Sequence, residues 1–196
     1  MKLCSGLRIA FSVIAMLVAV GSANAGAGCW QGVSHYNRGL DLQTKGDLDG
    51  AITEYRNSMG QCPTFWRPVY SLGTVLQAKG DIEGAVAQYR AVISEWPNIW
   101  QAHLALGNIL QDKGEHEAAI VEYRAVIKRR KKEPEAHYHL GRSLQAKGDL
   151  QGAIVEYRTA IRLRPDYPKA QSAIAEALKS NDKSPNRTSP VPGLFR

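Results

Sequence analysis

Residues 66–99 read WRPVYSLGTVLQAKGDIEGAVAQYRAVISEWPNI, and this stretch decides the fold. Apolar or small residues lie three or four positions apart in its first half, as on one face of a helix: Val69, Leu72, Gly73 and Leu76. The second half has a similar stripe: Ile82, Ala85, Val86, Tyr89, Val92 and Ile93. Between them, Gly80 suits a helix C-terminus and Asp81 a helix N-cap, while Pro97 prevents continuation. The stretch therefore predicts a hairpin of two helices.

The same pattern recurs at a constant spacing along the chain. The recurring positions are Gly39, Gly73, Gly107 and Gly141; Gly46, Gly80, Gly114 and Gly148; Ala51, Ala85, Ala119 and Ala153; and Tyr55, Tyr89, Tyr123 and Tyr157. Self-similarity at this period is typical of one hairpin stacked several times, because a single hairpin cannot bury both of its faces. We expect an all-α fold, an α-solenoid of four hairpins with a C-terminal capping helix.

The expected organisation follows from this register. We predict a signal peptide over residues 1–25, a lead-in over 26–31, repeats over 32–65, 66–99, 100–133 and 134–167, a capping helix over 168–179, and a disordered tail over 180–196. The capping helix has an apolar side and a polar side, and the tail is rich in Pro, Ser and Asn, a composition that does not bury a core.

The repeats resemble the tetratricopeptide repeat family. The residues that carry the resemblance are Leu72-Gly73, Ala85, Tyr89 and Pro97; Leu106-Gly107, Ala119 and Tyr123; and Leu140-Gly141, Ala153, Tyr157 and Pro165. The first repeat departs from the pattern at Arg38, where Leu is usual, and the third at Lys131, where Pro is usual. The resemblance implies a concave groove, lined by the first helix of each hairpin, that holds a peptide or helix of a partner protein.

The N-terminus has the layout of a secretory signal. Lys2 and Arg8 are followed by an apolar run from Ile9 to Val20, and then by Ala23-Asn24-Ala25, a small-x-small cleavage site. The apolar run is too short to span a bilayer easily, although an uncleaved anchor is the alternative. We expect an exported protein, in the bacterial periplasm or secreted.

Two cysteines remain after cleavage, Cys29 and Cys62. They lie just before the first helix of repeat 1 and at the end of its second helix, and these two ends are adjacent in an antiparallel pair. An oxidising compartment then favours a disulfide. Lipidation of Cys29 is an alternative, while a metal site at the two cysteines would have too few ligands.

The groove residues follow from helical spacing. We expect partner binding by Tyr36, Gln43, Arg67, Tyr70, Gln77, Asn108, Gln111, Tyr138, Arg142 and Gln145. The glutamines form a row with one member per repeat, and such a row either hydrogen-bonds a peptide backbone or is a relic of duplication on a solvated face. The tyrosines either contact a partner or pack between helices. The arginines and Asn108 suit an acidic partner.

The formal net charge is +7, or +5 without Lys2 and Arg8. No basic stripe interleaves with aromatic residues, so we expect no nucleic-acid partner. The one charge run, Lys128, Arg129, Arg130, Lys131 and Lys132, is either a solvated helix end or a contact with an anionic membrane or cell-wall surface.

The sequence contains no motif for catalysis. His35, His103 and His137 recur at one position of the repeat, and because equivalent positions in neighbouring hairpins lie about 10 Å apart, they are too far apart for one metal ion. We therefore expect no enzyme, no cofactor and no metal site. The sequence predicts a scaffold that binds another protein in its groove; the alternative is a self-associating structural component of the cell envelope.

Overall fold

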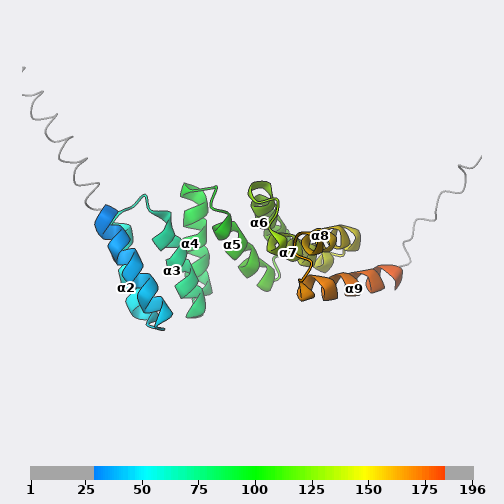
Figure 1. Ribbon diagram of the computed structural model, residues 1–196, viewed down its shortest axis with the longest axis horizontal. Coiled ribbons are helices and arrows are strands. Elements are labelled where there is room, and N and C mark those ends of the chain that lie inside the picture. Colours follow the sequence, from blue (N-terminus) through cyan, green and yellow to red (C-terminus); the bar gives the residue numbers. More distant parts are fainter. Residues whose placement is uncertain (1–28, 184–196) are drawn as a thin grey trace, which may run out of the picture. The chain divides into compact units, whose positions relative to one another are not determined.

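The computed structural model describes residues 29–183, and every regular element in this range is an α-helix (Figure 1). The chain divides into two compact units, Met1–Pro97 and Asn98–Arg196. The first unit contains a helix over residues 29–44 and then α2 (Leu48–Gln61), α3 (Trp66–Ala78) and α4 (Ile82–Glu95). The second contains α5 (Trp100–Asp112), α6 (His116–Arg129), α7 (Pro134–Ala146), α8 (Leu150–Leu163) and α9 (Pro168–Lys183).

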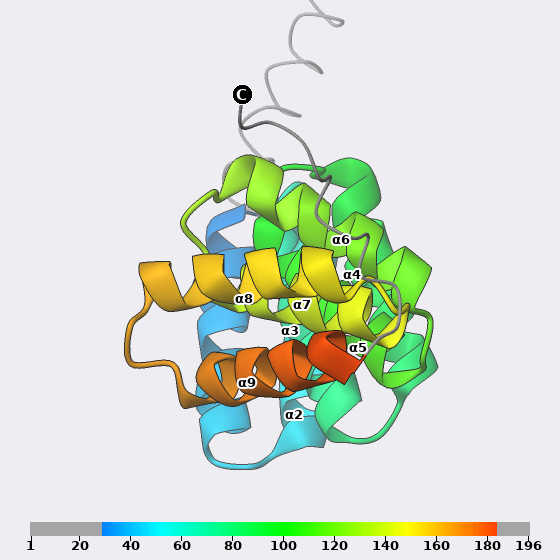
Figure 2. The ribbon, with the colours of Figure 1, turned by 90° about the vertical axis from the view of Figure 1, so that its right-hand side faces the viewer.

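Within each unit, helices that follow one another in sequence pack together as hairpins. In the second unit α5 packs on α6, α6 on α7, α7 on α8 and α8 on α9. Figure 2 shows α9 beside α7 and α8. The predicted signal peptide lies outside the described residues. Among the helices that are described, none combines the length and the apolar character needed to cross a bilayer.

The inner turn of each hairpin is built by a glycine and, in most repeats, an aspartate. Gly46, Gly80, Gly114 and Gly148 have φ between +78° and +85°, a left-handed conformation that L side chains rarely adopt. The next residue caps the second helix: in α4, the Asp81 carboxylate accepts a hydrogen bond from the backbone N–H of Gly84 at 2.9 Å. Glu115 occupies the equivalent position before α6 and makes no such bond.

The core of each hairpin is a tyrosine of the second helix packed on a glycine of the first. Tyr55, Tyr89, Tyr123 and Tyr157 are among the most completely buried side chains. A Cβ atom added to Gly39 would lie 2.5 Å from Cε1 of Tyr55, and the corresponding distances at Gly73, Gly107 and Gly141 are 2.7–2.8 Å. These glycines are therefore required because the ring occupies the space of a side chain.

The start of the first helix differs from the expectation. Residue 29 is already helical, so Cys29 belongs to the first helix rather than preceding it, and the helix does not begin at residue 32. This helix lies close to the end of α2. The Sγ atoms of Cys29 and Cys62 are 2.03 Å apart, and the Ser58 hydroxyl donates a hydrogen bond to the carbonyl of Gly32 at 2.6 Å.

The last helix also differs, because α9 continues to Lys183 instead of ending at residue 179. The added turn is held by α8, where Nε2 of Gln151 donates a hydrogen bond to Oδ1 of Asn181 at 2.8 Å. Residues 184–196 of the predicted tail lie outside the described residues. The helices α3, α5, α7 and α9 begin at residues 66, 100, 134 and 168, so α9 keeps the register of the first helices.

We predict that Gly39→Ala destabilises the protein by about 1–3 kcal/mol, because the new methyl group overlaps the Tyr55 ring. The control is Gly60→Ala, since the space around the Gly60 Cβ position is open and the residue is helical with ordinary φ. Urea unfolding followed by circular dichroism measures both changes. Equal midpoints for the two variants would contradict the packing argument.

A bond between Cys29 and Cys62 closes a loop with a sequence separation of 33, which corresponds to about 3–4 kcal/mol in the chain-entropy model. We expect a reducing agent to lower the melting temperature of the oxidised protein. The double variant Cys29→Ser/Cys62→Ser should melt at the lower temperature with or without the reductant. If the melting temperature of the native chain is the same with and without the reductant, the bond does not form.

Candidate functional site

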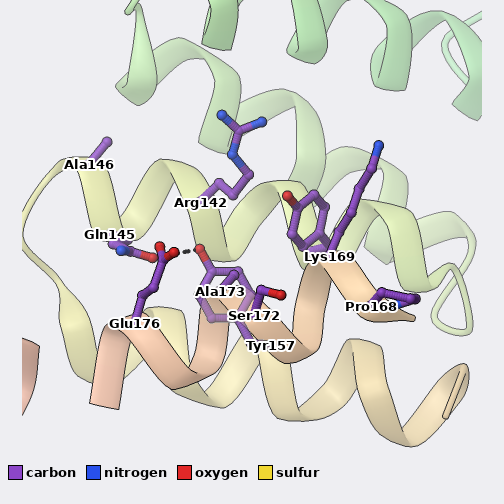
Figure 3. A pocket seen from close by; sticks show the side chains of 10 residues that line it. Arg142, Gln145, Ala146, Tyr157, Pro168, Lys169, Ser172, Ala173 and Glu176 are labelled. Carbon is purple, nitrogen blue, oxygen red and sulfur yellow. Dashed lines mark hydrogen bonds between the residues drawn. The ribbon is translucent and has the colours of Figure 1, made fainter. Parts of the chain in front are cut away.

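The second unit contains a cavity of about 600 Å³ between α7, α8 and α9 (Figure 3). Its lining residues are Tyr138, Arg142, Gln145 and Ala146 of α7, Tyr157 of α8, and Pro168, Lys169, Ser172, Ala173 and Glu176 of α9. Three of these, Tyr138, Arg142 and Gln145, are among the groove residues expected from sequence. The cavity is therefore part of the surface formed by the first helices.

The cavity carries separated charges. Arg142 of α7 and Lys169 of α9 are exposed, and their side chains extend in the same general direction (Figure 3). Within residues 29–183, neither side chain has a carboxylate partner in an ion pair. The one acidic residue of the lining, Glu176, lies beside Gln145 and Tyr157 (Figure 3). The wall formed by Arg142 and Lys169 is thus suited to an anionic group.

Arg142 and Lys169 also influence the pKa of His139, which lies on α7. Burial, together with the positive charges of Arg142 and Lys169, lowers the pKa of His139 to about 4. The ring is therefore neutral at pH 7. Its Nδ1–H donates a hydrogen bond to Oε1 of Gln111 at 3.0 Å, and its ring stacks on Tyr123 with centroids 5.6 Å apart. Glu135 of α7 also lies 3.9 Å from Nε2 of His139, so the ring faces both signs of charge, and burial is the main cause of its low pKa.

The glutamines of the row make hydrogen bonds within the fold. In three repeats the tyrosine hydroxyl of the second helix donates to the glutamine Oε1: Tyr55 to Gln43 at 2.6 Å, Tyr89 to Gln77 at 3.2 Å and Tyr157 to Gln145 at 2.8 Å. Burial raises the pKa of each of these tyrosines, that of Tyr55 to about 12, so the hydroxyls remain protonated donors. These three amides keep their NH₂ groups to donate toward a ligand, but their acceptors are already occupied.

Gln111 departs from the row. Its side chain is buried, and Nε2 donates to the carbonyl of His139 at 3.0 Å and to Oγ of Ser143 at 2.8 Å, while Oε1 accepts from His139. All of its hydrogen-bonding capacity is thus spent in connecting α5 to α7. Asn108 takes the place of the glutamine beside the core tyrosine and accepts from the Tyr123 hydroxyl at 2.9 Å. In this structure Gln111 is a structural link, contrary to the expected groove contact.

The three expected groove tyrosines are half-buried and contact the core tyrosine of their own hairpin, and two of them also pack on the aromatic residue before the next first helix, Tyr36 on Phe65 at 5.1 Å and Tyr138 on Tyr167 at 5.2 Å. Ring centroids are 5.9 Å apart for Tyr36 and Tyr55, 5.6 Å for Tyr70 and Tyr89, and 6.0 Å for Tyr138 and Tyr157. Each of the three side chains is partly exposed. The last expected groove residue, Arg67, is exposed, with its guanidinium 5.7 Å from the centre of the Trp66 ring.

Sequence reasoning missed the contribution of α9 to the cavity. Lys169, Ser172 and Glu176 lie one repeat length after Glu135, Tyr138 and Arg142, which are groove positions of the fourth repeat. Extending the repeat register by one more helix would have identified them.

The recurring histidines have a structural role in the described part of the chain. Each one contacts a glutamate of its own second helix through Nδ1: His35 with Glu54 at 2.7 Å, His103 with Glu122 at 2.7 Å and His137 with Glu156 at 2.6 Å. Across residues 29–183, no group of three His, Cys, Asp or Glu side chains is arranged to hold a metal ion. The histidines therefore link the two helices of a hairpin.

The fold defines a protein of the helical-repeat class, an all-α solenoid as expected from sequence. A tetratricopeptide repeat family model matches residues 70–126, and a TPR repeat model matches residues 107–148 and 141–182. Together the matches cover more than half of the chain. The chain belongs to the tetratricopeptide repeat family. No curated protein sequence matches it.

Solved structures show the same fold. The crystal structure of MamA protein is 24% identical, with a TM-score of 0.71, and the match covers 78% of this chain and 83% of that one. YrrB, described as "a TPR protein with an unusual peptide-binding site", is 21% identical over 72% of this chain and 73% of its own, with a TM-score of 0.63. Pseudomonas aeruginosa PilF is 15% identical over 80% and 71%, with a TM-score of 0.69. At these identities the likeness establishes the fold alone.

Two histidines of α7 should give opposite pH dependences of stability. A folded pKa of about 4 for His139 means that the unfolded chain binds more protons below about pH 6.5, so the stability it contributes is present above that pH and falls by about 2 kcal/mol by pH 5. Burial opposes the charged form of His137, but Glu156 and the Lys131 carbonyl outweigh it and raise the pKa of His137. Its contribution is therefore present below about pH 6.5 and is lost as pH rises through the folded pKa.

Urea unfolding at pH 5 and pH 7.5 tests both histidines. Relative to the native chain, His139→Gln should be least harmful at pH 5, whereas His137→Gln should be most harmful at pH 5. The same sign for both variants would contradict the assignment of the two environments.

Proposed function

We propose that the protein is an exported, non-catalytic scaffold that binds a segment of a partner protein along the first helices of its hairpins. We propose further that the cavity of the second unit receives an acidic side chain of that segment. The observation that carries this proposal is the pair of cations, Arg142 and Lys169, on the wall of a cavity of about 600 Å³ with no carboxylate partner among the described residues.

Three features support this chemistry. After burial, the positive charges of Arg142 and Lys169 are the causes that lower the pKa of His139, which is consistent with a cationic wall. The amide NH₂ of Gln145 is a donor beside the cavity, since its oxygen is held by Tyr157. Tyr138 adds a partly exposed ring of the kind that is enriched at protein interfaces. YrrB, a relative by fold, is described as having a peptide-binding site.

Export is part of the proposal and is supported by the sequence. The first 25 residues have the order of charge, apolar run and small-x-small site that precedes signal cleavage. A Cys29–Cys62 bond is also stable in the periplasm or outside the cell, where thiols are oxidised. We therefore place the mature scaffold in the periplasm or among secreted proteins.

Two matched sets of fluorescent peptides test the acidic preference. One set contains Asp and Glu at varied positions, and the other has Asn and Gln at the same positions. We expect the acidic set to bind more tightly, and Arg142→Gln to weaken that binding about fivefold, the effect of about 1 kcal/mol for a partly exposed ion pair. Fluorescence anisotropy at low and physiological salt measures the affinities.

The matched control is Arg90→Gln, which removes one positive charge from an exposed residue of α4 that is not in the cavity. It should leave the affinities unchanged. Equal binding of the two peptide sets, or an acidic preference that survives Arg142→Gln combined with Lys169→Gln, would refute the proposed role of the cavity.

The second candidate function is self-association as a structural component of the cell envelope. One observation favours it: Trp30 and Val33 lie one turn apart on the first helix and are 76% and 40% exposed. Sedimentation velocity over a range of concentrations separates the two functions. An oligomer that persists on dilution and dissociates in Trp30→Ser favours self-association.

A further inference from the structure

The second helices of the two hairpins in the second unit, α6 and α8, carry a repeated stripe of one valine and two cations; we call the face that bears it the outer face. On α6, Val121, Arg124 and Lys128 are exposed and lie on one face, since they are three and four residues apart. The stripe recurs one repeat later on α8: Val155, Arg158 and Arg162, all exposed. The two valines are 63% and 58% exposed, and they are among the few large apolar side chains that the described residues expose. Because both helices pack on α7 as second helices of consecutive hairpins, the two stripes face the same side.

The four cations of these stripes are Arg124, Lys128, Arg158 and Arg162, and all four are exposed. Within residues 29–183 none of them forms an ion pair with a carboxylate. The acidic groups nearby are engaged elsewhere: Glu122 and Glu156 contact the hairpin histidines, and Glu117 pairs with Lys147 at 3.0 Å. The outer face of α6 and α8 therefore has four positive charges and two apolar side chains without internal partners.

The first unit provides a comparison at equivalent positions. There the arginine is kept, as Arg56 on α2 and Arg90 on α4. The valine positions hold Thr53 and Ala87, and the second-cation positions hold Gly60 and Ser94. Packing does not require the valine or the second cation, because the same fold forms without them.

The residues of the charge run, which sequence left open between a solvated helix end and a surface contact, do not all have the same environment. Arg129 donates to the carbonyl of Ala125 at 3.0 Å, and the Arg130 guanidinium lies 4.9 Å from the centre of the Trp100 ring. These two cations are thus held against their own chain. Of the five residues in the run, Lys128 belongs to the outer stripe.

We propose that the outer face of α6 and α8 binds the surface of an anionic lipid bilayer, with Arg124, Lys128, Arg158 and Arg162 at the headgroups and the two valines at the acyl boundary. Cations attract an anionic surface by about 1 kcal/mol each, and apolar side chains among them add burial that a purely ionic contact lacks. A bilayer also fits a stripe of long side chains with no pocket between them. An acidic protein is the competing partner, and the test separates it from lipid.

The test uses the signal-free full chain and vesicles of phosphatidylcholine alone or mixed with phosphatidylglycerol in equal parts. We expect binding to the mixed vesicles only. Arg158→Gln/Arg162→Gln should lower the partition coefficient about 30-fold, which is about fivefold for each charge removed. The matched control, Arg56→Gln/Arg90→Gln, removes the same charge from the outer face of the first unit and should bind as the native chain does.

A second variant tests the valines without changing charge. Val121→Ser/Val155→Ser should weaken binding several-fold, and the loss should persist in high salt, because apolar burial is not screened. Four results would overturn the proposal: equal binding to both vesicle types, equal loss for the two arginine pairs, unaltered binding of the valine variant, or binding to soluble polyglutamate with none to vesicles. Binding of acidic peptides in the cavity should be unaffected by Arg158→Gln/Arg162→Gln, so the two surfaces are tested independently.

Discussion

The contact on which each hairpin depends is that between a tyrosine ring of the second helix and a glycine of the first. The ring fills the space of the missing side chain, and its hydroxyl donates a hydrogen bond to an amide oxygen one turn further along the same face of the first helix. The distance and orientation of the two helices are therefore fixed together. The same contact limits what these amides can offer a ligand, because the oxygens of Gln43, Gln77 and Gln145 each accept a tyrosine hydroxyl while their NH₂ groups make no hydrogen bond with described residues.

The third repeat solves the same packing problem in another way. Asn108 accepts from Tyr123, which releases Gln111 from that role, and Gln111 instead connects α5 to His139 and Ser143 of α7. His139 is then buried beside Tyr123 and close to Arg142 and Lys169, so its charge is suppressed. Because Asn108 replaces Gln111 as the partner of Tyr123, Gln111 is free to hold His139, whose pKa is lowered by burial and by the cations of the cavity.

The second unit differs from the first in how much charge it leaves without a partner. On the groove side, Arg142 and Lys169 border a cavity, and on the outer side the stripes of α6 and α8 combine cations with valines. Elsewhere in the described chain, several charges are neutralised locally, as in the pairs Lys45–Asp41 and Lys147–Glu117. Together, the proposed functions describe an adaptor that holds a protein segment on one face while its other face rests on a membrane.

Much of the fold could be predicted from the sequence because the determinants of a hairpin are local and recur. Gly80 and Asp81 mark a turn from their own conformational preferences, and a constant repeat period is visible in a single chain. The expected groove set included Tyr138, Arg142 and Gln145 of the cavity for the same reason, since helical spacing assigns residues to a face. Lys169 and Glu176 were not in this set, because their place in the lining depends on α9 packing in the position of a further first helix.

The sequence by itself thus determined the helix pairs, their register and the face on which each side chain lies. Only the tertiary structure decided which atoms meet: that tyrosine hydroxyls occupy the glutamine oxygens, that Gln111 is buried against a residue 28 positions away, and that Cys29 lies inside a helix. The physical reason is that periodicity along a helix fixes direction, whereas hydrogen bonding and burial depend on the approach of segments that are distant in the chain.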